Sequence, residues 1–148
     1  MNNQEIDIKY MQEALNEARH AADEDEVPVG AVIVWKGRII ARGHNMTEKL
    51  QDPTAHAEMI AITAATEAMG GKYLTDCTLY VTVEPCPMCA GAIAWAQIGR
   101  MVYGTPDPKR GFSLFYPSIM HPKTDVTCGI LSEDCSIIVK NFFMKKRR

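Results

Sequence analysis

The sequence has no apolar run that approaches the ~20 residues a helix needs to span a membrane. Its first ten residues are polar, where a secretory signal would be basic and then apolar. Five cysteines, an odd number, do not suit a fully paired disulfide framework. We therefore expect a protein without a membrane anchor that works in a reducing cytoplasm.

The chain also lacks a strong excess of charge of either sign. A net charge of −2 over 148 residues argues against a protein that coats nucleic acid nonspecifically. The charge is unevenly placed, because residues 23–26 are all acidic whereas residues 145–148 are all basic. A basic end can contact phosphates, but from charge alone a solvated helix end is the commoner explanation. The length fits one globular domain over residues 1–148.

Two short motifs carry side chains that bind metals. The first, His56-Ala57-Glu58, offers an imidazole and a carboxylate, and the second, Pro85-Cys86-Pro87-Met88-Cys89, offers two thiols. A catalytic zinc usually has three protein ligands and one open position, whereas a structural zinc has four protein ligands. We therefore predict one Zn²⁺ per chain, bound by a nitrogen of His56 and the thiolates of Cys86 and Cys89. Glu58 then remains free to transfer protons.

Other uses of a Cys-x-x-Cys pair explain less of the pattern. A redox pair does not need the upstream His-x-Glu motif, and a structural zinc ribbon needs a second ligand pair at short range. The remaining cysteines, Cys77, Cys128 and Cys135, form no such pair, and we expect them to be small buried residues. Glu58 could alternatively stabilise only the start of a helix. Together, however, the two motifs are the signature of zinc-dependent nucleobase deaminases.

The hydrophobic pattern predicts alternating helices and strands. Helices are expected at residues 8–22, 57–68, 87–96 and 132–146, and strands at 30–35, 38–41, 78–83, 100–104 and 125–128. Thr54 and Ser132 are the expected N-caps of the second and fourth helices. In this arrangement His56 and Cys86 stand at two helix starts, whose partial positive charge favours thiolate over thiol.

A zinc site of this kind predicts a hydrolytic mechanism. Bound zinc lowers the pKa of water from 15.7 to about 7, so zinc-bound hydroxide is the expected nucleophile at neutral pH. Glu58 would accept the proton of that water, pass it to a ring nitrogen of the base and help to protonate the departing amino group. The hydroxide adds to the ring carbon that carries the exocyclic amine, and ammonia leaves.

Beyond the two motifs, the chain resembles the bacterial tRNA-specific adenosine deaminases (TadA type) from residue 27 to residue 147. The matching stretches are residues 27–32, 52–58, 78–92, 98–104 and the pair Phe142-Phe143. The resemblance implies an α/β fold of cytidine-deaminase type, a three-layer αβα sandwich with a mixed central sheet. It also implies a homodimer and the conversion of adenosine to inosine at the wobble position of a tRNA anticodon.

The same resemblance assigns substrate contacts by position. Asn45 would hydrogen-bond the flipped nucleotide, although from the residues alone it could equally be a turn residue. The remaining contacts fall in three groups: Val29, Gly30 and Ala57 around the pocket, Asp107 and Lys109 along the path of the anticodon stem-loop, and Phe143 and Arg147 against the RNA.

The chain departs from this family after Lys109. The family commonly continues through small residues, whereas residues 110–117 read Arg-Gly-Phe-Ser-Leu-Phe-Tyr-Pro. Guanine deaminases share the two metal motifs, so a free-base or nucleoside deaminase is the alternative prediction. A catalytically silent zinc-stabilised binding module is a third, and the presence of Glu58 argues against it. We prefer the tRNA substrate because residues 98–104, the Asp-x-Lys loop and the basic Phe-Phe helix follow the tRNA enzymes.

Overall fold

A five-stranded mixed sheet forms the centre of the protein in the computed structural model, which describes residues 1–115 and 117–147. The strands are β1 (Gly30–Trp35), β2 (Arg38–His44), β3 (Cys77–Val83), β4 (Arg100–Thr105) and β5 (Asp125–Cys128). They are ordered β2-β1-β3-β4-β5 in the sheet. β1 runs antiparallel to β2 and β3, whereas β3, β4 and β5 are parallel. The mixed central sheet predicted from the sequence is thus confirmed.

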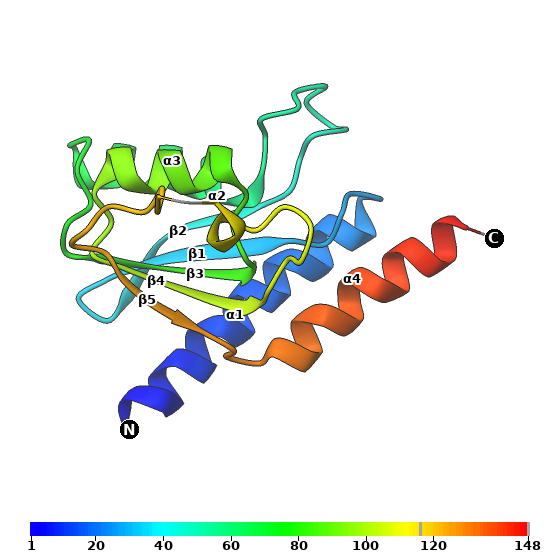
Figure 1. Cartoon of the computed structure of the whole chain (residues 1–148), viewed down its shortest axis with the longest axis horizontal. Coiled ribbons are helices and arrows are strands. Elements are labelled where there is room, and N and C mark those ends of the chain that lie inside the picture. Colours follow the sequence, from blue (N-terminus) through cyan, green and yellow to red (C-terminus); the bar gives the residue numbers. More distant parts are fainter. Residues whose placement is uncertain (116, 148) are drawn as a thin grey trace.

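Helices cover both faces of this sheet (Figure 1). α2 (Ala57–Met69) and α3 (Pro87–Ala96) lie on one face, and α1 (Asn3–Asp23) and α4 (Ser132–Lys146) lie on the other. A short 3-10 helix, η1 (Phe112–Leu114), follows β4. The three-layer αβα sandwich is therefore confirmed. Within the described residues, no helix combines the length and the apolar character needed to cross a membrane.

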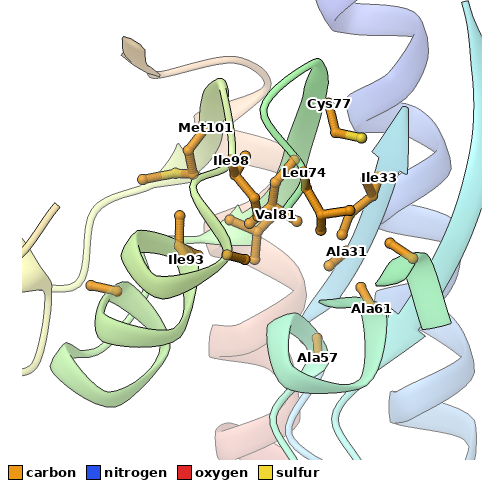
Figure 2. Close-up of a cluster of buried hydrophobic side chains, with 14 of the residues drawn as sticks. Ala31, Ile33, Ala57, Ala61, Leu74, Cys77, Val81, Ile93, Ile98 and Met101 are labelled. Atoms are coloured by element: carbon orange, nitrogen blue, oxygen red, sulfur yellow. The ribbon is translucent and has the colours of Figure 1, made fainter. Parts of the chain in front are cut away.

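Two apolar clusters fill the spaces between the layers. Ala31 and Ile33 of β1 belong to the cluster under α2 and α3, whereas Val32 and Val34 belong to the cluster under α1 and α4. Successive residues of a strand face opposite sides of a sheet, so β1 is apolar throughout because both of its faces are covered. Figure 2 shows the first cluster, with labelled members Ala31, Ile33, Ala57, Ala61, Leu74, Cys77, Val81, Ile93, Ile98 and Met101.

Three local predictions are wrong. Thr54 does not cap α2, because its amide and hydroxyl both donate to Asp52 Oδ1 in a turn that ends before the helix, whose N-cap is His56. Ser132 is the first residue of α4 and not its cap, which is Leu131. Cys128 is exposed because it lies on β5, the edge strand, although Cys77 and Cys135 are buried as expected.

Candidate metal and catalytic site

Two helix starts bring the predicted zinc ligands together. His56 is the N-cap of α2 and Cys86 is the N-cap of α3, and both have extended backbone at the point where the helix begins. Pro87 occupies the first turn of α3, where the missing N–H of proline costs no helical hydrogen bond. Cys89 lies three residues after Cys86 and therefore on the same face of the helix start.

The three ligand atoms converge on one point. His56 Nδ1 lies 3.7 Å from Cys86 Sγ and 3.4 Å from Cys89 Sγ, and all three atoms are within 4.8 Å of one another. The ring nitrogen that faces the sulfurs is thus Nδ1. In residues 1–115 and 117–147 no other group of three histidine, cysteine or acidic side chains is placed in this way.

This donor set fits zinc. Imidazole nitrogen and thiolate sulfur are the ligands that zinc prefers, and three of them leave a fourth position open. Hydrogen bonds from the Cys89 thiol and from the His56 ring lower the pKa of Cys86 to about 4, despite the opposing effect of burial. These hydrogen bonds favour the thiolate form of Cys86, which is the form that binds a metal.

Glu58 is buried beside the ligands without being one of them. It lies in the first turn of α2 and is only 4% exposed. Burial raises the pKa of Glu58 to about 7, although a backbone hydrogen bond and the nearby His56 oppose the rise. A carboxyl group with such a pKa both accepts and releases a proton at neutral pH, which general acid–base catalysis requires.

Asn45 lies in a loop that a second buried carboxylate holds. Glu26 is 1% exposed and accepts hydrogen bonds from the amides of Glu48 at 3.1 Å and Lys49 at 2.7 Å. The Asn45 amide lies 3.5 Å from Glu26 Oε1, and its backbone N–H donates to the carbonyl of Val29. Sequence reasoning missed Glu26, because it ends an acidic run whose other three residues are exposed.

Among the predicted pocket residues, Gly30 has a packing role. A Cβ at Gly30 would lie 2.0 Å from the carbonyl oxygen of Ala14, so only glycine lets α1 approach β1 this closely. The missing side chain of Gly30 thus faces the α1 layer. Ala57 is the buried first residue of α2, directly after His56, and Val29 is half-buried.

Asp107 organises the loop after β4. Its Oδ1 accepts the backbone N–H groups of Lys109 and Arg110, each at 3.0 Å, and both of those side chains are exposed. The hydrogen bond to Cys86 raises the pKa of His56, and the positive charge of Arg110 opposes that rise.

Phe143 and Arg147 are on α4, in the other helical layer. Phe143 is 43% exposed, with Phe142 packed edge-on against it. Next to Arg147, Lys146 forms an ion pair of 2.5 Å with Asp25. No hydrogen bond within the described part of the chain joins Phe143 or Arg147 to the ligand cluster, and Arg148 lies outside that part. Only a substrate large enough to reach both layers can contact α4 and the metal site together.

Known proteins resemble this chain along most of its length. The family model for the cytidine and deoxycytidylate deaminase zinc-binding region matches residues 4–105. A tRNA-specific adenosine deaminase of Bacillus subtilis is 44% identical over 147 residues, which cover 96% of this chain and 91% of that protein. A solved structure from studies of A-to-I editing by tRNA:A34 deaminases at the wobble position superposes with a TM-score of 0.82 at 46% identity, covering 88% of this chain and 98% of that one.

A guanine deaminase structure from Bacillus subtilis is also similar. Its TM-score is 0.65 at 41% identity, and the match covers 72% of this chain and 66% of that one. The matched family region contains Glu58 and all three residues that converge on the metal position, His56, Cys86 and Cys89. The protein therefore belongs to the zinc-dependent cytidine and deoxycytidylate deaminase family and, within it, to the tRNA-specific adenosine deaminases.

Proposed function

We propose that the protein hydrolyses adenosine to inosine at the wobble position of a tRNA anticodon. One observation carries this proposal: three zinc ligands and one buried, unligated carboxylate converge in a chain 44% identical to a tRNA-specific adenosine deaminase. Zinc binding alone would not need the carboxylate. The overall reaction consumes water and releases ammonia.

Glu58 is the catalytic acid and base in this proposal. When bound, zinc supplies a Lewis acid that makes a water-derived nucleophile available at neutral pH. Glu58 takes up the proton that the attacking water loses and delivers it to a ring nitrogen of the base. It then takes up the proton of the hydroxyl group that has been added to the ring carbon and delivers it to the amino group as the bond between carbon and exocyclic nitrogen breaks, so that ammonia leaves and a carbonyl remains. Burial of Glu58 excludes bulk water from these transfers.

An RNA substrate is large enough to contact residues both at the base pocket and far from it. An enzyme that acts on a base within RNA must hold that base outside the stack, and it gains affinity from phosphates and stacking. We assign Asn45, Val29, the backbone of Gly30 and Ala57 to the base pocket, Asp107 and Lys109 to the anticodon loop, and Phe143 and Arg147 to more distant RNA. The last two need a long substrate, because they lie in the other helical layer.

A homodimer is part of the same proposal. α3 contains no charged residue, yet Trp95 on it is 84% exposed. A groove of about 400 Å³ runs along this helix between Tyr73, Gly91, Trp95 and His121. Helices that are apolar on all sides are normally covered, so we infer that a second copy covers this face. We further propose that residues 1–148 act as one catalytic domain in the cytoplasm.

One experiment separates this function from its alternative. The protein is incubated with an anticodon stem-loop that carries a wobble adenosine and, separately, with free guanine, cytosine and adenosine, and inosine and ammonia are measured. A stem-loop with the adenosine moved one position is the matched control. We expect inosine only from the first RNA. Faster turnover of guanine than of RNA would replace the proposal with a guanine deaminase, to which the similar solved structure points.

A further inference from the structure

Glu84 is a buried carboxylate with no part in the chemistry described above. It directly follows β3, two residues before the zinc ligand Cys86, and is 4% exposed. Its Oε1 accepts the backbone N–H of Asp107 at 3.0 Å. Its Oε2 accepts the backbone N–H of Ser113 at 3.0 Å and the hydroxyl of Ser113 at 2.6 Å. Every one of these bonds comes from the loop that follows β4.

This loop lies against Glu84 more closely than most residues would allow. A Cβ at Gly111 would be 2.3 Å from the carboxylate carbon of Glu84, so with any larger residue there either the loop or the Glu84 carboxylate must shift, and the hydrogen bonds between them are disturbed in both cases. The N–H of Phe112 donates to the carbonyl of Pro85 at 2.9 Å. Phe112 itself is buried and packs edge-on against Tyr103. The loop is thus fixed to the turn that leads into Cys86.

Two exposed cations lie between the two points of attachment. Lys109 and Arg110 stand after Asp107 and before Ser113, and their backbone amides are held by the Asp107 carboxylate. A charged loop that is already ordered binds a phosphate without the entropy cost of fixing its backbone. Glu84 itself is too enclosed to meet the substrate.

We propose that Glu84 is a positioning residue that holds Lys109 and Arg110 beside the metal site, where they bind the phosphates that flank the target base. This inference rests on the proposed RNA substrate and adds a determinant of its specificity. A small free base has no phosphates, and its turnover does not depend on the loop.

The variant Glu84→Gln tests the attachment. The amide keeps the size of the carboxylate but replaces one acceptor oxygen with a donor, so at least one hydrogen bond to the loop is broken. We expect the amides of Asp107 and Ser113 to exchange hydrogen at least about tenfold faster, with one zinc per chain retained. We expect KM for the stem-loop to rise about tenfold while kcat changes less than about twofold, because only binding is weakened. The slope of log affinity against log salt should fall by about 0.7 for each phosphate that the loop no longer binds.

Two further variants separate loss of the loop attachment from a general loss of stability. Gly111→Ala separates the loop from the Glu84 carboxylate without changing the chemistry of residue 84, so it should raise KM in the same way. The double variant Glu84→Gln/Gly111→Ala should raise KM no more than the larger of the two single variants does, since both changes break the same attachment of the loop. Asp7→Asn removes another buried carboxylate, on α1 and therefore on the sheet face away from the two helices that carry the metal ligands (Figure 1), and should lower stability while leaving KM unchanged.

The outcomes are distinct. The positioning role is overturned if Glu84→Gln leaves hydrogen exchange at the amides of Asp107 and Ser113 unchanged, or leaves KM for the stem-loop unchanged. Loss of zinc together with kcat in Glu84→Gln also overturns it, because Glu84 would then serve the metal turn. A wild-type protein that leaves the stem-loop unmodified refutes the proposed function instead, while the exchange measurement still decides whether Glu84 holds the loop.

Discussion

Glu58 and Cys86 are near each other in space yet have opposite protonation tendencies. Burial raises the pKa of the Glu58 carboxyl, whereas hydrogen bonds from Cys89 and His56 lower the pKa of the Cys86 thiol. One residue thus retains a proton that it can transfer, and the other has lost the proton that would block metal binding.

We expect Glu58→Gln to abolish turnover and retain zinc. Glutamine has the shape of glutamate but cannot take up a proton, and this residue serves several proton transfers. The loss of kcat should therefore exceed the ~10²–10⁴ usual for one general acid–base group. Zinc content measured by metal analysis should remain one per chain. Zinc loss in this variant would make Glu58 a ligand instead.

Cys86→Ala should give the converse result. One of the three converging ligand atoms is removed, so zinc content should drop far below one per chain. The first turn of α3 should also lose stability, because Cys86 begins that helix. Metal analysis of the purified variant decides the matter, and a full zinc content would contradict the assignment of this ligand.

The ligand residues could be predicted from the sequence because the side chains of each motif are close together in the sequence and are of types that bind metals or transfer protons. His56 and Glu58 are two residues apart, and Cys86 and Cys89 are three apart. Glu26 and Glu84 could not be predicted in this way. Their burial depends on loops 22 to 29 residues further along the chain, which no local pattern connects to them.

At the scale of elements, a buried ion pair ties α1 to the sheet. Asp7 of α1 accepts two hydrogen bonds from the Arg100 guanidinium, at 2.8 and 2.7 Å, and one from the Tyr80 hydroxyl at 2.7 Å. Arg100 also donates to Thr127 of β5. These contacts join α1, β3, β4 and β5, so one carboxylate fixes a helix across three strands.

This ion pair predicts a pH dependence of stability. Burial alone would raise the pKa of Asp7, but hydrogen bonds from Arg100 and Tyr80 outweigh it and leave that pKa below its ordinary value. The stabilisation is therefore complete above the unfolded-state pKa of about 3.9 and is lost as the pH falls through the lower folded-state value. At pH 7 we expect Asp7→Asn to cost about 1.5–3 kcal/mol in denaturant unfolding. The difference from wild type should shrink below pH 4, and a constant difference would contradict this origin.

The basic end of α4 gives a second prediction at this scale. Lys146 pairs with Asp25 in an exposed ion pair, which contributes little to stability. Deleting residues 145–148 should therefore leave the unfolding midpoint nearly unchanged. Affinity for the stem-loop should fall, and its salt dependence should flatten by about 0.7–0.9 in slope for each phosphate that the shortened helix no longer binds. Equal binding by the truncated and full chains at every salt concentration would make this end only a solvated helix terminus.

Most element positions could be predicted, whereas two helix caps could not. The bounds of β1, β5, α3 and α4 match the sequence prediction, because apolar periodicity and flanking turn residues mark them. Whether a short polar residue caps a helix depends on the hydrogen-bond partner that its side chain has in the folded protein. Thr54 bonds Asp52, and α4 begins after a residue with φ of 53°, Leu131.

At the scale of the whole molecule, the two helical layers differ in how completely they are covered. α1 carries charged residues on its outer side, as the outermost layer of a monomer requires. α3 has none, and its outer side exposes Trp95 beside the exposed Tyr73. The mixed sheet and its helical layers do not require an exposed apolar face on α3. This face is therefore a separate property of the surface of the protein.

Trp95→Glu should convert a dimer into a folded monomer. Exposed tryptophans at interfaces often contribute about 2 kcal/mol or more to binding, so the dissociation constant should rise about 30-fold or more. Because Trp95 is 84% exposed in one copy, its loss should not destabilise the monomer itself. Analytical ultracentrifugation measures the change, and Ile137→Glu on α4, an exposed apolar position of the other layer, is the matched control that should stay dimeric. A wild-type protein that is monomeric at micromolar concentration, or a Trp95→Glu variant that dimerises as well as wild type, would show that a second copy does not cover α3.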